Sequence, residues 1–225
     1  MSYLSRIDHA FSDAPVLPLS ENGRYVLFSD CHRGIGTSND NFLKNQHLYF
    51  AALNYYYQHS FCYIELGDGD ELWENRSFSA IQNIHSNVFW LLSLFYEEHR
   101  LFMLFGNHDI AKKDFHPFSD CCFHEGLRLK DCVTGQELYL THGHQADFFN
   151  STLWRLSCFL VRYLWKPLEQ FGVLDPTSAA KNYKVKNKTE QRLQEWTKLH
   201  KKILITGHTH RPVLGSKDSL YFNTG

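Results

Sequence analysis

Residues 24–34 read Arg-Tyr-Val-Leu-Phe-Ser-Asp-Cys-His-Arg-Gly, an apolar run that stops at two side chains able to bind a metal. The run predicts a buried β-strand, and Asp30 and His32 follow it at alternate positions. In an extended segment alternate side chains leave on the same side, so the pair would chelate one cation. The stretch therefore predicts a strand that ends in a chelating pair.

Four further apolar runs, residues 61–66, 101–105, 137–141 and 202–206, also end in polar clusters. The clusters are Gly67-Asp68, Gly106-Asn107-His108-Asp109, His142-Gly143-His144 and Gly207-His208-Thr209-His210. Open α/β sheets gather ligands at the carboxyl ends of their strands, so we expect all five clusters to meet at one edge. Their carboxylate, imidazole and amide donors suit two borderline divalent ions, which indicates a dinuclear hydrolytic centre.

Helices are predicted between the strands, at about 42–59 and 78–98. The first four clusters follow one another at intervals of roughly 35 to 40 residues, about one βαβ unit each. The predicted fold class is α/β, an α+β sandwich of two stacked mixed β-sheets flanked by helices, with the metal site at the strand ends.

The interval before the last cluster is nearly twice as long, which predicts a helical insert at about 147–200. Its first part, 153–165, is apolar, and its second, 178–202, is rich in lysine. Proline and glycine between the two parts favour a helical hairpin that caps the metal edge, with lysines facing a phosphate or a phospholipid head group. The alternative is structural, with the first helix on the core and the second as a solvated face.

The composition suits one metal-binding domain over residues 1–225, because 43% of the residues are hydrophobic. A net charge of -1 provides no strong nucleic-acid signal. Six cysteines without a CxxC pair, and no leader-like start, favour a cytoplasmic setting, and no apolar stretch is long enough to cross a bilayer. The chain stops at Gly225 just as a strand ends, so we expect a shortened C-terminus. The oligomeric state stays open.

The five clusters, in this order, resemble the signature blocks of the calcineurin-like metallophosphoesterase superfamily. Those blocks run Asp-x-His, Gly-Asp-x-x-Asp/Glu, Gly-Asn-His-Asp/Glu, a histidine often beside glycine, and Gly-His-x-His, and the second is Gly67-Asp68-Gly69-Asp70-Glu71 here. The resemblance spans residues 30–210. It implies a metal-dependent phosphoric ester hydrolase that cleaves a phosphomonoester, phosphodiester or pyrophosphate by in-line attack of a hydroxide shared by two metal ions.

The resemblance also implies which residues hold the two ions. The implied ligands are Asp30, His32 and His210 for the first ion, Asn107, His142 and His208 for the second, and Asp68 as the bridge. Manganese is the first expectation, with iron, zinc, cobalt or nickel as alternatives.

Catalytic and substrate contacts follow from the same blocks. His108 would protonate the leaving oxygen and Asp109 would orient its imidazole, although a purely hydrogen-bonding role for His108 is an alternative. Arg33 would grip a phosphate oxygen, or else form a surface ion pair. The amide of Asn107 would bind a phosphate oxygen, and His144 would contact substrate or a metal-bound water.

Other polar residues near the blocks receive supporting roles. Glu71 would stabilise its loop around the ligands, and Asp70 would be a solvated acid. His47, His85 and His124 are interpreted as ordinary surface or packing residues.

The segment Glu71-Leu72-Trp73 and the helical insert are similar to the UDP-2,3-diacylglucosamine pyrophosphatases, which carry arginine where this chain has His108. We therefore expect a general phosphoesterase acting on a small phosphorylated substrate, lipid- or nucleotide-linked. The alternatives are such a lipid-precursor hydrolase, a metal-dependent nuclease and a non-catalytic scaffold. The insert is also a candidate for peripheral membrane contact. Near-neutral charge weakens the nuclease interpretation, and the intact ligand set weakens the scaffold.

Overall fold

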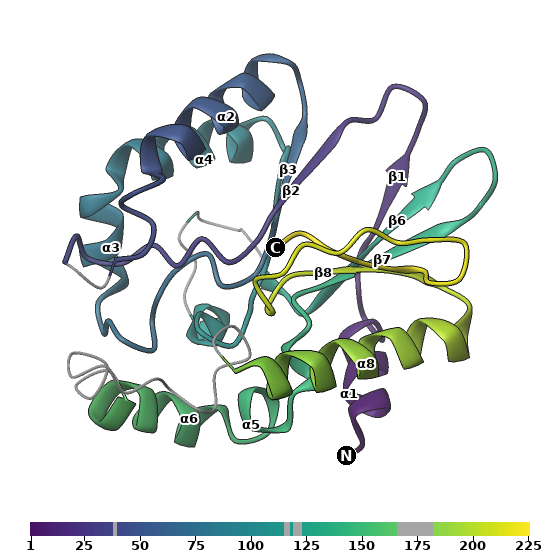
Figure 1. The fold of residues 1–225 in the computed structure, drawn as a ribbon. Helices are drawn as coiled ribbons and strands as arrows, with labels where there is room; N and C mark the ends of the chain where they lie inside the picture. Colours follow the sequence, from purple (N-terminus) through teal and green to yellow (C-terminus); the bar gives the residue numbers. More distant parts are fainter. Residues whose placement is uncertain (38–39, 115–117, 119–122, 166–181) are drawn as a thin grey trace.

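The computed structural model describes residues 1–37, 40–114, 118, 123–165 and 182–225. Two β-sheets lie between helices, so that the described elements form four layers (Figure 1). The predicted α/β fold class, two stacked sheets flanked by helices, is confirmed.

The first sheet has the strand order β2-β3-β4-β5, and all its described pairings are parallel. Its strands are β2 (Tyr25–Phe28), β3 (Cys62–Leu66), β4 (Leu101–Leu104) and β5 (Phe123–His124). The first three lie within the predicted runs. Parallel strands are covered on both faces, which is why they read as continuous apolar runs.

The second sheet has the order β1-β6-β7-β8-β9, and here pairing is mixed because β6 and β7 are antiparallel. Its strands are β1 (Val16–Leu19), β6 (Gly126–Asp131), β7 (Glu137–Thr141), β8 (Ile203–Thr206) and β9 (Tyr221–Asn223). Mixed pairing among the described strands is thus confined to this sheet. On the outer side of the edge strand β9, Val213 makes an antiparallel bridge to Asn223.

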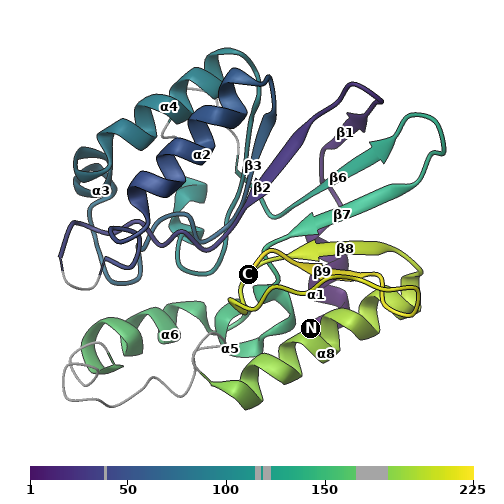
Figure 2. The same ribbon diagram turned by 45° about the horizontal axis from the view of Figure 1, so that its top comes forward.

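The outer face of the first sheet is covered by α2 (Gln46–Gln58) and α4 (Ser86–Glu97), and α3 (Phe78–Ile84) packs against α4 (Figures 1 and 2). The single helix predicted for 78–98 is interrupted at His85. The buried His85 ring lies 2.9 Å, Nε2 to Oδ2, from Asp40 in the loop before α2. His85 therefore ties two segments together, which no local pattern in the sequence indicated.

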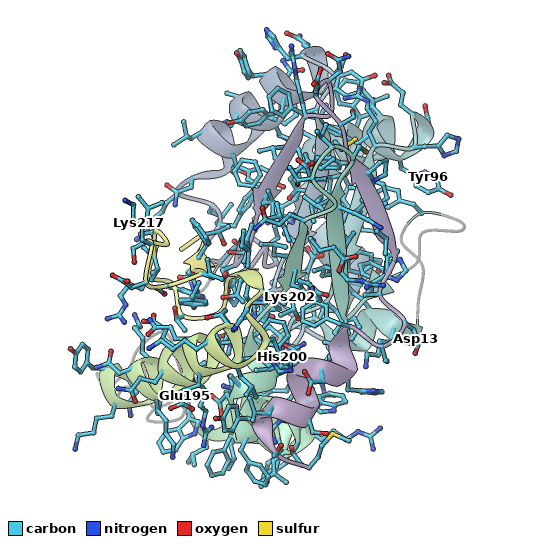
Figure 3. The ribbon with its side chains drawn as sticks, turned by 90° about the vertical axis from the view of Figure 1, so that its right-hand side faces the viewer. Asp13, Tyr96, Glu195, His200, Lys202 and Lys217 are labelled. Carbon is cyan, nitrogen blue, oxygen red and sulfur yellow. The ribbon has the colours of Figure 1, made fainter. Side chains whose placement is uncertain are left out.

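The second sheet is covered by α1 (Tyr3–Ala10) and α8 (Tyr183–His200), which lie side by side in Figure 3. Their contact is partly polar, because Tyr3 Oη donates to Glu195 and Trp196 Nε1 donates to Asp8 at 2.8 Å. Leu193 and Trp196 of α8 are buried with Ile7 in one apolar cluster. The apolar face of α8 is thus part of the sheet packing.

The remaining described helices are short. They are η1 (Ile110–Asp114), η2 (His144–Ala146), α5 (Phe148–Ser151), α6 (Trp154–Leu160) and the π-helical η3 (Val161–Trp165). The turn predicted around residues 167–176 lies outside the described residues, so the cap over 147–200 stays a prediction. Among the helices that the structure describes, none combines the length and apolarity needed to cross a membrane.

Apolar side chains fill the space between neighbouring layers. The cluster between the sheets includes Ile64, Leu66, Leu104 and Leu140, all fully buried. Because these residues belong to β3, β4 and β7, the cluster fixes the carboxyl ends of strands from both sheets next to one another. Packing therefore positions the polar residues that follow those strands.

Candidate metal centre

The loops that follow five strands meet at one edge of the sandwich. Asp30 follows β2 and Asp68 follows β3, and the Asp30 backbone N–H donates to the Gly67 carbonyl at 3.1 Å. On the second sheet, the Gly207 N–H donates to the His142 carbonyl at 3.0 Å. These bonds extend the strand pairing into the loops, so the predicted clusters come together.

A first group of donors consists of Asp30, His32 and His210, which we call the first triad. His210 Nε2 lies 3.3 Å from both Asp30 Oδ1 and His32 Nε2. One ligand atom of each residue lies within 4.8 Å of the others. The three residues are thus close enough to bind one cation.

A second group consists of Asp68, His142 and His208, the second triad, whose ligand atoms meet the same 4.8 Å limit. Asp68 Oδ2 lies 3.1 Å from His142 Nε2 and 3.9 Å from His32 Nε2 of the first triad. One carboxylate oxygen therefore faces both triads. This is the position that a bridging ligand needs.

Two histidines are fixed in the tautomer that a metal requires. His142 Nδ1 lies 3.0 Å from the Leu66 carbonyl oxygen, which only accepts, so Nδ1 donates and Nε2 is the nitrogen left to coordinate a metal. His32 Nδ1 lies 2.8 Å from Glu71 Oε2 in the same way. Such outer contacts orient histidine ligands and raise their basicity.

Several buried donor atoms at this edge have no hydrogen-bond partner. They are Asn107 Oδ1, His142 Nε2, His144 Nδ1 and both ring nitrogens of His208. An unpartnered buried polar atom costs roughly 1 to 3 kcal/mol, so a cluster of them asks for an explanation. Cations coordinated by Asn107, His142 and one ring nitrogen of His208 would satisfy three of these five atoms. The residues present therefore fit divalent metal ions.

The charge states of Asp68 and His208 agree with that fit. Burial acts to raise the pKa of Asp68, but His142 and His108 outweigh it and hold the pKa well below its usual range. Asp68 is thus a carboxylate at neutral pH. Burial lowers the pKa of His208, so its ring is neutral at neutral pH and able to coordinate a metal. Burial acts to lower the pKa of His142, but Asp68 outweighs it and raises the pKa to about 9, so a metal would have to displace a proton there.

The backbone at the ligands is left-handed rather than extended. The φ angle is positive at five of the predicted ligand positions, namely Asp30, His32, Asp68, His208 and His210. Our reasoning that alternate residues of an extended segment share a side is therefore wrong for these pairs. Left-handed turns direct them instead, and such strain in non-glycine residues clusters at functional sites.

Two glycines allow the loops to approach the ligands. A Cβ atom on Gly106 would collide with the carboxylate of Asp68, and one on Gly207 would collide with that of Asp30. Any larger residue at either position would displace a carboxylate. Steric contact with these carboxylates therefore explains why glycine occupies both positions.

The His108 ring lies 4.8 Å, centroid to centroid, from the ring of His32 in the first triad, and its side chain is 22% exposed. Its ring stacks on Trp73 with centroids 4.3 Å apart, and its Nδ1 lies 2.8 Å from Glu71 Oε1. Glu71 therefore holds both His108 and His32. Burial acts to lower the pKa of His108, but Glu71 and Asp68 outweigh it and raise the pKa to about 10.

The predicted role of Asp109 in orienting His108 is wrong. Its carboxylate accepts the backbone N–H groups of Gly69 at 3.0 Å and Gly106 at 2.7 Å, and it pairs with Lys112 Nζ at 2.7 Å. Asp109 is fully buried and fixes the two loops that carry Asp68 and Asn107. The residue that orients His108 is Glu71.

Arg33 and Asp70 also require correction. Arg33 is fully buried, and its guanidinium donates to Asp70 at 2.7 Å and to Glu65 at 2.8 Å. It cannot reach a substrate phosphate or the surface. Lys112 is also fully buried, 2.6 Å from Asp70. Asp70 is therefore a buried ion-pair partner and not a solvated acid.

These residues form what we call the salt-bridged cluster. Its members are Arg33, Glu65, Asp70, Asp109 and Lys112. Sequence reasoning missed Glu65 and Lys112. Glu65 could have been found, because it is a glutamate inside an apolar strand. Strand positions buried on both faces rarely carry an unpaired charge, so such a residue indicates a buried ion pair.

His144 is buried, with its ring centroid 5.4 Å from that of His142. Burial lowers the pKa of His144 well below its usual range, and the nearby His142 and His208 lower it further. Its ring is thus neutral and next to the second triad. Its contact with substrate stays a prediction.

A further residue holds the last ligand block in place. Glu190 of α8 is buried, accepts from Thr209 Oγ1 at 2.9 Å and from Arg211 Nε at 3.0 Å. Thr209 lies between His208 and His210. No motif in the sequence marks Glu190.

The two triads differ in their exposure to solvent. All three residues of the second triad are buried, whereas the His210 side chain of the first is 39% exposed. A substrate can therefore approach from the side of the first triad.

Comparisons with known proteins add little. No family model matches the chain, and no curated protein matches it. One solved structure that it is similar to is a conserved uncharacterized protein of Streptococcus pneumoniae TIGR4, described as a predicted phosphoesterase, with 15% identity over 89% of this chain and 71% of that chain and a TM-score of 0.40.

Proposed function

We propose that this chain is a phosphoesterase that uses two divalent metal ions to hydrolyse a phosphate ester. The observation that carries the proposal is the grouping of the Asp68, His142 and His208 ligand atoms within 4.8 Å of one another, with unpartnered nitrogens on both histidines. Asn107, whose buried Oδ1 is also unpartnered, precedes His108, which donates its backbone N–H to Asp68 at 2.8 Å. Bound there, the ions would supply Lewis acidity and a nucleophilic water at neutral pH.

The chain's own groups fit the other demands of this reaction. Glu71 and Asp68 keep the His108 imidazole protonated at neutral pH, so that it can donate a proton to the departing oxygen. Trp73 stacks on the ring and limits its rotation. His108 is thus our candidate general acid, with Glu71 as its positioning residue.

Asp68 is the most informative residue to replace. We expect Asp68→Asn to lose both metal ions and at least about a hundredfold in kcat, since the bridge contributes to both sites. Metal content is measured by elemental analysis after manganese reconstitution. The exposed Asp218→Asn serves as the matched control and should retain both.

The reaction class is tested with 4-nitrophenyl phosphate, bis(4-nitrophenyl) phosphate, a nucleotide-sugar pyrophosphate and single-stranded DNA, each with manganese and then with EDTA. Turnover that EDTA abolishes is the expected outcome. Two manganese ions bound without turnover of any substrate would contradict the proposal and favour a scaffold. Preference for the pyrophosphate would favour the lipid-precursor hydrolase that the resemblance suggested.

A further inference from the structure

A cavity of about 620 Å³ opens beside the first triad, and Asp30, His32 and His210 form part of its wall. Sites for small molecules commonly have volumes of roughly 300 to 1,000 Å³. We propose that this cavity binds a flat aromatic group of the substrate, of about the size of a nucleobase, while the phosphate lies at the triads. This inference rests on the proposed function.

One face of α2 forms a wall of the cavity. Asn45, Tyr49, Ala52 and Tyr56 line it, and they follow one another at the three- and four-residue spacing of a single helix face. The cavity therefore runs along α2, starting from the first triad. A group attached to a phosphate at the triads would enter it directly.

Aromatic rings make up much of the apolar lining. Phe28 and Phe42 pack against Tyr49 with centroids 5.3 and 5.0 Å apart, both edge to face. The Tyr49 hydroxyl lies 2.6 Å from that of Tyr63, so Tyr49 presents its ring and not its hydroxyl. Aromatic groups bind favourably to such surfaces through stacked or edge-to-face contacts.

Polar groups at the rim favour a heteroaromatic ring over a hydrocarbon chain. Asn41 and Asn45 are exposed, and no residue of the described chain forms a hydrogen bond with either side-chain amide. An amide both donates and accepts, which suits the polar edge of a nucleobase. Leu48 beside them is 73% exposed, and a ring would cover it.

The sharpest test compares two esters with the same leaving oxygen. Adenosine 5′-monophosphate and ribose 5-phosphate differ only in the base, so their kcat/KM ratio isolates its binding. We expect at least about a tenfold preference for the nucleotide, as one stacked base typically provides. For diesterase activity, thymidine 5′-(4-nitrophenyl) phosphate against methyl 4-nitrophenyl phosphate serves in the same way.

Two neighbouring alanines of α2 provide matched variants. Ala52 lines the cavity, whereas Ala51 is exposed and does not. Ala52→Trp should fill the cavity and abolish the preference, and Ala51→Trp should retain it. If thermal denaturation shows that Ala52→Trp does not fold, Ala52→Leu replaces it and should reduce the preference.

Equal kcat/KM values within both substrate pairs would overturn the inference. The inference would also be overturned if kcat/KM rose more from methyl phosphate to hexyl phosphate than from ribose 5-phosphate to the nucleotide. The cavity would then be a site for an alkyl group. Calorimetry on the EDTA-treated protein separates this inference from the proposed function. If no ester is hydrolysed, tighter binding of the nucleotide than of ribose 5-phosphate still supports the cavity's role, and equal binding overturns it.

Discussion

Two carboxylate clusters lie next to each other in the chain and differ in how their charges are balanced. Asp70 belongs to the salt-bridged cluster, where Arg33 and Lys112 supply cations from within the protein. Asp68, two residues earlier, belongs to the second triad, whose partners are histidines with unpartnered nitrogens. Carboxylate proximity alone marks both as metal sites. The presence or absence of an internal cation separates them.

The largest expected effect comes from removing an internal cation. Lys112→Met should lower the free energy of unfolding by about 3 to 5 kcal/mol, because it leaves buried carboxylates without their counter-charge. The neighbouring Lys113, exposed above the Phe105 ring, is the control. Urea denaturation should show a loss below about 1 kcal/mol for Lys113→Met. Similar losses for both variants would break the comparison.

Acid should weaken the salt-bridged cluster in a defined range. Burial acts to raise the pKa of Asp70, but Arg33 and Lys112 outweigh it and lower the pKa to about 2. A carboxyl with a depressed folded-state pKa stabilises above its unfolded pKa, so this contribution of about 2 kcal/mol is lost between about pH 4 and pH 2. Asp70→Asn should lack that part of the pH dependence of unfolding. A variant whose acid profile matches the wild type would show that Asp70 is not stabilised by its cations.

Glu71 is intermediate between the two clusters, because its ion pairs within the described residues are with the histidines His32 and His108. Glu71→Gln should lower the pKa of His108 by at least about one unit, which corresponds to about 1.4 kcal/mol. Histidine NMR titration of the metal-free protein measures it. Glu74 contributes least among the causes identified, so Glu74→Gln should produce a smaller change. The reverse order would remove Glu71 as the positioning residue.

The smallest expected effect is an increase, and not a decrease, in the free energy of unfolding. Asn107→Leu should raise the free energy of unfolding in EDTA by about 1 kcal/mol, since it removes an unpartnered buried oxygen, and should reduce stabilisation by manganese. Asn223 is the matched control, because its buried Nδ2 lies within hydrogen-bond reach of four oxygens. Asn223→Leu should be destabilised. Thermal denaturation with and without manganese measures both variants.

The sequence predicted the strands and the ligand blocks because both are local patterns. Apolar runs ending in Asp30, Asp68 or His142 are read directly, and parallel pairing brings their ends together. Ion pairs between distant residues have no such pattern. Arg33 was therefore misassigned, and Lys112, on the short η1 helix, was missed.

The interruption at His85 and the role of Glu190 have the same origin. Each depends on one contact with a residue far away in the chain, Asp40 and Thr209 respectively. Periodicity describes which face of a helix is apolar, but it does not identify a partner for one polar residue on that helix.

The bond from Glu190 to Thr209 has a thermodynamic consequence. If His208 and His210 hold a metal, its coordination is linked to the docking of α8 on its sheet, because Glu190 of α8 holds the loop that carries both histidines. The coupling free energy is the same in both directions, so metal binding would stabilise the docked helix by as much as docking strengthens metal binding. Conversely, metal loading should slow amide hydrogen exchange along that helix, far from any coordinating atom.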